Sequence, residues 1–196
     1  MNLLAHAYLS FDQPELLVGN MINDYVKGKK QFDYPDAVHK GMLLHRSIDD
    51  FTDSHPVTKQ LKSFFKDDYR LYAGAFGDVC YDHFLANDTN QFENDAALKS
   101  FGAQVYAVLD AHFDLLPETF QRMVPYMKKE DWLYNYKFPQ GMKNSFAGLV
   151  KRSAYLTDSD TAFEIFNRHY NDIQICYDEF FPLLKSFAKE QFDLLS

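Results

Sequence analysis

The sequence predicts an all-α fold, because its apolar side chains recur at helical spacing and strand signals are missing. Most segments place apolar residues three or four positions apart, which is the spacing of one helix face. Only eight Gly and seven Pro interrupt the 196 residues, and no alternating apolar and polar pattern persists. No repeat, linker or low-complexity segment divides the chain, so we expect a single-domain helical bundle over residues 1–196.

Prolines and glycines bound the expected helices. Pro14 opens one helix, Gly28 is placed as its C-terminal stop, and Pro117 ends another helix further along the chain. The second half contains four or five more helices, and we expect the longest near residues 160–177. The helices expected before these cover residues 2–10, 14–27, 35–55, 59–65, 69–87 and 95–116.

Composition narrows the class of protein. Hydrophobic residues make up 46% of the chain, enough for one sizeable core, and the formal charge of −8 argues against general nucleic-acid binding. No apolar run approaches the ~20 residues that span a bilayer, and the N-terminus lacks a secretory pattern. The two cysteines, Cys80 and Cys176, lack the spacing of a zinc or redox motif. We therefore expect a cytoplasmic protein that binds neither membrane nor nucleic acid.

Histidines and aspartates recur at helical spacing in the first half of the chain. His45 lies four positions before Asp49, and Asp78 lies four before Asp82, so each pair shares one helix face. Burying several ionisable groups together is costly unless they pair or hold a metal ion. The candidate ligands of one divalent-metal site are His6, Asp24, His45, Asp49, Asp78, Asp82 and His83.

Any one of these histidines taken alone is better explained as a hydrogen-bonded core residue or a surface residue, and Asp49 with Asp50 can equally be a solvated helix edge. Only their coincidence on inward helix faces favours a metal site. A divalent ion can polarise a phosphoryl oxygen and lower the pKa of a bound water molecule. The pattern therefore favours phosphoester hydrolysis.

Five motifs in the first 86 residues carry a resemblance to a known family. They are MNLLAH at residues 1–6, GN at 19–20 with DYVKG at 24–28, Gly41 with LHRSID at 44–49, FTD at 51–53 with HP at 55–56, and YDHFL at 81–85. In order and spacing they resemble the acyl carrier protein phosphodiesterase family. A further stretch, GLVKR at residues 148–152, is similar to that family as well.

The resemblance implies an all-helical relative of the His-Asp (HD) phosphohydrolases that uses Mn²⁺, with Mg²⁺ or Fe²⁺ as alternatives. It implies that the protein removes the 4′-phosphopantetheine arm from holo acyl carrier protein by cleaving the phosphodiester to the carrier serine. Asp24 occupies the position of an aspartate that is essential in the family. The resemblance therefore assigns Asp24 a catalytic role in metal binding or water activation.

Two positions depart from the family pattern. His45 is followed by Arg46, so the adjacent His-Asp pair of the broader superfamily is absent there, and Asp49 lies one turn further on. Position 23 is Asn where a small residue is expected. The first departure leaves the ligand set open, and the second affects local packing.

Three polar residues near the motifs are candidates for substrate binding. Arg46 and Arg152 can each hold phosphodiester oxygens through paired donors, and each is equally well explained by a surface ion pair. Asn20 shares a face of its predicted helix with Asp24. We therefore include Asn20 with the two arginines.

Lys27, Lys29 and Lys30 form a basic run at the end of the predicted helix that carries Asp24. Such a run is usually a solvated surface. An acidic carrier protein, however, needs a local positive patch to dock on an acidic enzyme. We therefore predict that these three lysines bind the carrier protein.

The sequence leaves three functions open. The leading hypothesis is a metal-dependent phosphodiesterase that acts on holo acyl carrier protein. The second keeps the metal and replaces the substrate by a nucleotide or another small phosphoester, because folds and metal sites are reused across chemistries. The third is a helical protein that binds a partner without catalysis. Metal content separates the third hypothesis from the first two, and substrate assays separate the first from the second.

Overall fold

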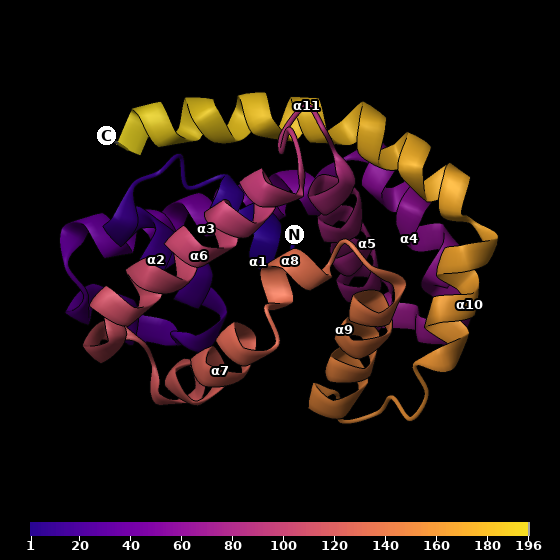
Figure 1. Cartoon of the computed structure of the whole chain (residues 1–196), viewed down its shortest axis with the longest axis horizontal. Helices are drawn as coiled ribbons and strands as arrows, with labels where there is room; N and C mark the ends of the chain where they lie inside the picture. The colour runs from indigo at the N-terminus through magenta and orange to yellow at the C-terminus, as the bar shows by residue number, and fades with distance from the viewer. Residues whose placement is uncertain (196) are drawn as a thin grey trace.

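The computed structural model describes residues 1–195, and within them it confirms the all-α prediction, because no strand is present. Figure 1 shows α1 (Leu3–Tyr8) at the centre of the molecule, surrounded by the other helices. The long helix α11 (Tyr170–Leu195) crosses the top of the view and spans nearly the full length of the bundle. Buried hydrophobic side chains from Met1 to Ala188 form one continuous core.

The remaining elements are short and follow one another closely. In the first half they are α2 (Pro14–Ile22), η1 (Asn23–Tyr25), η2 (Gly28–Asp33), α3 (Asp36–Ser54), α4 (Pro56–Tyr69), η3 (Arg70–Tyr72) and α5 (Ala73–Asn87), where η marks a 3₁₀ helix. In the second half they are α6 (Asp95–Ala111), η4 (Phe113–Leu115), α7 (Glu118–Lys129), α8 (Trp132–Asn135), α9 (Pro139–Arg152) and α10 (Asp160–Arg168).

The helix expected over residues 14–27 is shorter in the structure. α2 ends at Ile22, and Asp24 lies in the 3₁₀ turn η1. Asn and Asp are poor helix formers, and Gly28 adopts a φ of 58° that ends any right-handed continuation. The early end leaves the carbonyl of Asn20 among the last four of the helix, which lack an α-helical partner.

Four other expected helices, over residues 59–65, 69–87, 95–116 and 160–177, differ from the structure. α4 extends from Pro56 to Tyr69, and the chain breaks at Arg70, whose φ of 46° is incompatible with a helix, so the helix expected over 69–87 starts at Ala73. The helix expected over 95–116 ends at Ala111, before a 3₁₀ turn. The helix expected over 160–177 is divided at His169, and the longest helix begins at Tyr170 instead.

No helix in the described part of the chain combines the length and apolar character needed to cross a bilayer.

α2 and α3 cross at very close range through two glycines. A Cβ atom on Gly19 would lie 1.9 Å from the carbonyl oxygen of Val38, and one on Gly41 would lie 2.1 Å from that of Leu16. Only glycine permits this backbone approach. The crossing brings the end of α2 beside the turn of α3 that carries His45.

Gly19→Ala should destabilise the protein by about 3 kcal/mol or prevent folding, because the new methyl group must push the two helix backbones apart. Chemical denaturation measures this change in the free energy of unfolding. Gly74→Ala is the matched control: its Cβ would lie 3.3 Å from Lys62 Cε, the mobile end of a side chain, so a change below about 0.5 kcal/mol is expected. Equal effects in the two variants would contradict the close crossing.

Candidate active site

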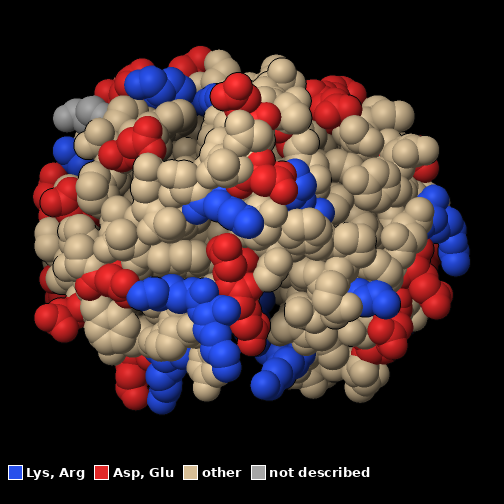
Figure 2. All heavy atoms as spheres, viewed as in Figure 1, with Lys and Arg blue, Asp and Glu red and all other residues tan. Residues whose placement is uncertain are grey.

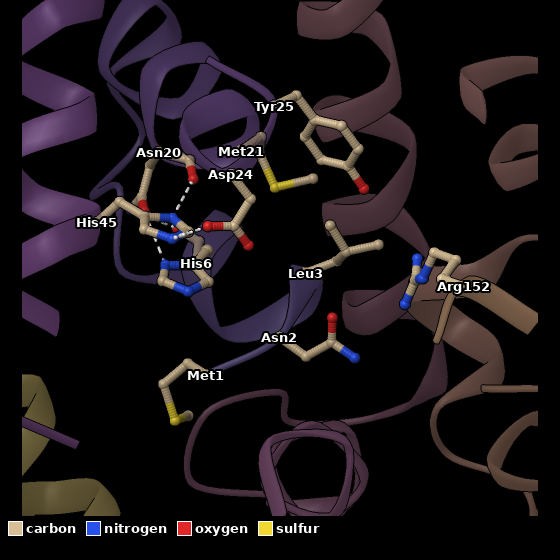
Figure 3. A pocket seen from close by; sticks show the side chains of 10 residues that line it. All are labelled: Met1, Asn2, Leu3, His6, Asn20, Met21, Asp24, Tyr25, His45 and Arg152. Atoms are coloured by element: carbon tan, nitrogen blue, oxygen red, sulfur yellow. Dashed lines mark hydrogen bonds and ion pairs between the residues drawn. The ribbon is translucent and has the colours of Figure 1, made fainter. Parts of the chain in front are cut away.

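Four elements bring polar side chains to one pocket of about 280 Å³. α1 contributes His6, α2 contributes Asn20, η1 contributes Asp24 and α3 contributes His45. Figure 3 shows the two imidazoles and Asp24 together on one side of the pocket, with Arg152 on the opposite side. The side chains that line the pocket are Met1, Asn2, Leu3, His6, Asn20, Met21, Asp24, Tyr25, His45 and Arg152.

Asn20 holds both imidazoles. Its side-chain Oδ1 lies 2.8 Å from His6 Nδ1, and its backbone carbonyl oxygen lies 2.7 Å from His45 Nδ1. Its Nδ2 donates to the backbone oxygen of His6 and to Ser10 Oγ, which fixes the orientation of the amide. Both histidines therefore donate from Nδ1, and in the neutral form each presents an unprotonated Nε2.

The two Nε2 atoms face the carboxylate of Asp49. His6 Nε2 lies 3.2 Å from Asp49 Oδ1, and His45 Nε2 lies 3.0 Å from Asp49 Oδ2. The imidazole rings stack with their centroids 3.8 Å apart. Both Nε2 atoms are buried, and among the described residues neither has a hydrogen-bond partner. Lone pairs of neutral imidazoles facing a carboxylate repel one another unless a proton or a cation lies between them.

This group has the chemistry and spacing of a divalent-cation site. His6, His45 and Asp49 each offer a ligand atom, and these atoms all lie within 4.8 Å of one another. Asp24 Oδ1 adds a fourth atom, 3.2 Å from His45 Nε2. Two ligands at right angles, each about 2.1 Å from an ion, lie about 3.0 Å apart. The measured separations of 3.0 to 3.2 Å match that value.

Without an ion, His45 is protonated, and its positive charge pairs with the carboxylates of Asp24 and Asp49. Burial opposes the charge on His45, but the Asp24 and Asp49 carboxylates outweigh this cost and raise its pKa to about 9. Burial and the neighbouring His45 charge lower the pKa of His6 to about 4. At neutral pH the pair therefore carries one additional proton and one positive charge, on His45, at the position where a cation would bind.

Arg46 fixes the turn that carries Asp24. Its Nε donates to Asn23 Oδ1 at 3.0 Å, and its Nη1 donates to Gln31 Oε1 at 2.7 Å, so Arg46 links η1 to η2. The Asn at position 23, unexpected in the family pattern, is thus the acceptor for Arg46, which follows His45 where the broader superfamily has Asp. Arg46 does not line the pocket. Asp24 remains 71% exposed at the pocket wall, where a substrate can reach it.

Asp78 and Asp82 are not members of the group formed by His6, His45 and Asp49. The Met1 amine lies 3.1 Å from Asp49 Oδ1 and 3.2 Å from Asp78 Oδ1. Both oxygens of Asp82 accept backbone N–H groups at the start of α1, from Leu4 at 2.8 Å and Ala5 at 3.1 Å. Burial raises the pKa of Asp82 to about 7. In this structure Asp82 anchors the helix that carries His6.

Both ring nitrogens of His83 contact residues outside the candidate site. Its Nδ1 lies 2.8 Å from the backbone oxygen of Tyr136, and its Nε2 lies 3.1 Å from the hydroxyl of Tyr170. His83 therefore fastens α5 to the chain after α8 and to α11, with no ring nitrogen left for the group around Asp49. Its position next to Asp82 in the sequence places it on a different side of α5.

The basic residues predicted to bind the substrate lie in two places. Arg152 lines the pocket, and no carboxylate in the described chain forms an ion pair with it. Lys27, Lys29 and Lys30 are exposed around the start of η2, just after the turn that carries Asp24. The sequence did not single out Tyr25, Met21, Asn2 and Leu3, which also line the pocket, because apolar or neutral side chains leave no pattern that distinguishes a pocket wall from the core.

The fold and the site define a helical protein with a His and Asp group of the kind that holds a divalent cation. The chain belongs to the acyl carrier protein phosphodiesterase family, whose model matches residues 1–184. It is 31% identical to the acyl carrier protein phosphodiesterase of Serratia proteamaculans over 191 residues, which cover 97% of this chain and 99% of that protein. The protein of the same name from Pectobacterium atrosepticum is 30% identical with the same coverage.

A third relative with this name, from Yersinia enterocolitica, is 29% identical over 97% of this chain and 99% of its own length. No solved structure matches the chain significantly. The match over nearly the whole of each relative confirms the resemblance carried by the N-terminal motifs.

A divalent cation should bind more tightly as the pH rises. His45 must lose its proton to act as a ligand, and its pKa is about 9 without metal. The dissociation constant for Mn²⁺ should therefore fall about tenfold for each pH unit from about 6 to 8, with about one proton released per ion. Calorimetric titrations of metal-free protein in buffers of different ionisation enthalpy measure both quantities.

His45→Asn should remove this pH dependence, whereas His112→Asn, in the turn after α6 and outside the pocket, should keep it. A wild-type affinity that stays constant over this range would contradict the assignment of His45. In the metal-free protein, the raised pKa of His45 contributes stability that is fully present below about pH 6.5 and is lost as the pH rises through about 9.

Proposed function

We propose that this protein hydrolyses the phosphodiester between 4′-phosphopantetheine and the serine of holo acyl carrier protein, using a bound divalent cation. The observation that carries the proposal is the convergence of two histidine Nε2 atoms on Asp49, beside an exposed Asp24, in a chain of this family. Histidine and aspartate ligands from separate helices also suit a relative of the HD phosphohydrolases. We place the protein in the cytoplasm.

His6, His45 and Asp49 would hold the ion, with Asp24 as a further ligand or the neighbouring base. Two imidazoles and carboxylates suit Mn²⁺ first, with Fe²⁺ or Mg²⁺ as alternatives. Such an ion polarises a phosphoryl oxygen and lowers the pKa of water. Asn20 keeps both imidazoles in the tautomer that directs Nε2 to the ion, the role expected of a second partner of a metal-bound histidine.

Asp24 is the residue best placed to receive a proton from the attacking water. It is exposed to the pocket, and contact with His45 holds its pKa below the usual value, so it is an ionised acceptor at neutral pH. The water oxygen forms the new bond to phosphorus, the bond from phosphorus to the serine oxygen breaks, and the proton taken up by Asp24 passes to that serine oxygen. The serine hydroxyl and free 4′-phosphopantetheine are the products.

Arg152 is the candidate for binding the phosphodiester itself. Its guanidinium lies across the pocket from the histidines, as Figure 3 shows, and no carboxylate within residues 1–195 pairs with it. A guanidinium can donate two parallel hydrogen bonds to phosphate oxygens. The scissile group would then lie between Arg152 and the ion site, within reach of Asp24.

Asp24→Ala should lower the rate of arm removal by about a thousandfold or more, because it deletes the ligand or base and no core contact. Mass spectrometry of holo acyl carrier protein incubated with Mn²⁺ and the variant detects the loss of the arm. Asp36→Ala, which removes an exposed carboxylate on α3, should retain wild-type activity. Wild-type activity in Asp24→Ala at saturating metal would refute this role.

Replacing Lys27, Lys29 and Lys30 with Glu should raise the KM for holo acyl carrier protein and remove much of its salt dependence. The three lysines offset the long-range repulsion between two acidic proteins. The effect should be greatest in dilute buffer, because the Debye length is about 8 Å at physiological ionic strength. Hydrolysis of a small phosphodiester should change little, since it requires no docking.

The same charge change at Lys59, Lys62 and Lys66 of α4 is the matched control. It separates a local docking patch from an effect of net charge. If the α4 variant raises the KM and the first variant does not, the carrier protein docks on α4. Equal increases in the two variants would mean that net charge alone is responsible.

A further inference from the structure

A second, larger cavity adjoins the candidate active site. Its volume is about 520 Å³, within the range of small-molecule sites, and it shares Asn2, Leu3 and Arg152 with the pocket that contains the histidines. Its walls are the end of α7, α8 and one face of α9. Figure 2 shows acidic and basic side chains bordering a narrow recess on this face of the molecule.

The α9 wall is a regular helical face of small and polar residues. Gly141 packs so closely on α8 that a Cβ there would lie 1.8 Å from the oxygen of Asn135, which fixes the two walls against each other. Asn144, Ser145 and Gly148 follow at helical spacing, and Arg152 completes the face one turn later. A Cβ on Gly148 would meet no atom within 4 Å, so the space beside it belongs to the cavity.

The lining combines apolar surface with neutral hydrogen-bonding groups. Leu3, Trp132 and Tyr136 supply apolar and aromatic surface, and the amides of Asn2 and Asn144 supply donors and acceptors. The lining also contains two acidic residues, Glu130 and Asp131, and two basic ones, Lys129 and Arg152, whose charges balance. This chemistry suits a neutral ligand with alternating apolar and amide groups, and not a second phosphate.

We propose that this cavity, which we call the arm cavity, binds the pantetheine portion of the substrate. The inference rests on the proposed function. A phosphodiester bound by Arg152 has two substituents: the carrier protein, which is far too large for 520 Å³, and a flexible chain of a dimethyl group, two amides and a thiol. Arg152 lies at the junction of the two cavities, so the chain continues from it into the arm cavity.

Gly148→Leu tests the arm cavity by filling it. The new Cβ meets no atom within 4 Å, the rest of the side chain extends into the cavity, and leucine replaces a helical glycine, so the fold should be retained and unfolding should not become easier. The KM for holo acyl carrier protein should rise about tenfold with a much smaller effect on kcat, the signature of lost substrate binding. Ala147→Leu is the matched control, because Ala147 is exposed on the same helix outside the cavity.

Binding without turnover gives an independent readout. Trp132 is the single tryptophan of the chain and lines the arm cavity. Titration with 4′-phosphopantetheine, followed by tryptophan fluorescence and by calorimetry, should show saturable binding to the wild-type protein and to Ala147→Leu. Binding to Gly148→Leu should be about tenfold weaker. Inorganic phosphate should leave the fluorescence of Trp132 unchanged.

The outcomes separate this inference from the proposed function. If the wild-type protein removes the arm and Gly148→Leu matches Ala147→Leu in KM and in binding, the arm cavity proposal is wrong and the proposed function stands. If the wild-type protein does not remove the arm, but 4′-phosphopantetheine binds in a manner that Gly148→Leu weakens, the cavity proposal stands and the reaction is wrong. Absence of both turnover and binding overturns both.

Discussion

The candidate site depends on one residue, Asn20, which accepts a hydrogen bond from each of two histidines. Its side chain fixes His6 and its backbone carbonyl fixes His45, so both rings present Nε2 to the same carboxylate, Asp49. Removing either bond would free a ring to rotate or change tautomer. A cation or a proton is then required between groups that otherwise repel one another. The metal chemistry we propose uses this arrangement, with a cation in place of the proton.

The scaffold around Asn20 serves to keep the two rings together. The glycine crossing of α2 and α3 brings the Asn20 carbonyl to His45, and the early end of α2 leaves that carbonyl without an α-helical partner. Asp82 anchors α1 by its first amides and so positions His6. Because α1, α2 and α3 meet there and α5 anchors α1, the site requires the packed bundle.

The sequence predicted what depends on local period and spacing. Helical repetition predicted an all-α fold, and the interval between His45 and Asp49 placed them on one face. The sequence could not predict that His6 stacks on His45, because that contact depends on how α1 packs against α3. Adjacent residues also took different roles: Asp82 anchors α1, whereas His83 bonds to Tyr136 and Tyr170. The helix breaks at Arg70 because this residue adopts a positive φ, which the residue type Arg does not indicate.

The most direct test of the account is anomalous diffraction from crystals of the protein soaked with Mn²⁺. The account predicts one strong manganese peak within bonding distance of the Nε2 atoms of His6 and His45 and of the Asp49 carboxylate. The same soak of Asn20→Ala crystals should give a much weaker peak at this position, because the rings are no longer fixed. A manganese peak elsewhere in the wild-type protein, with the two histidines left uncoordinated, would contradict the account.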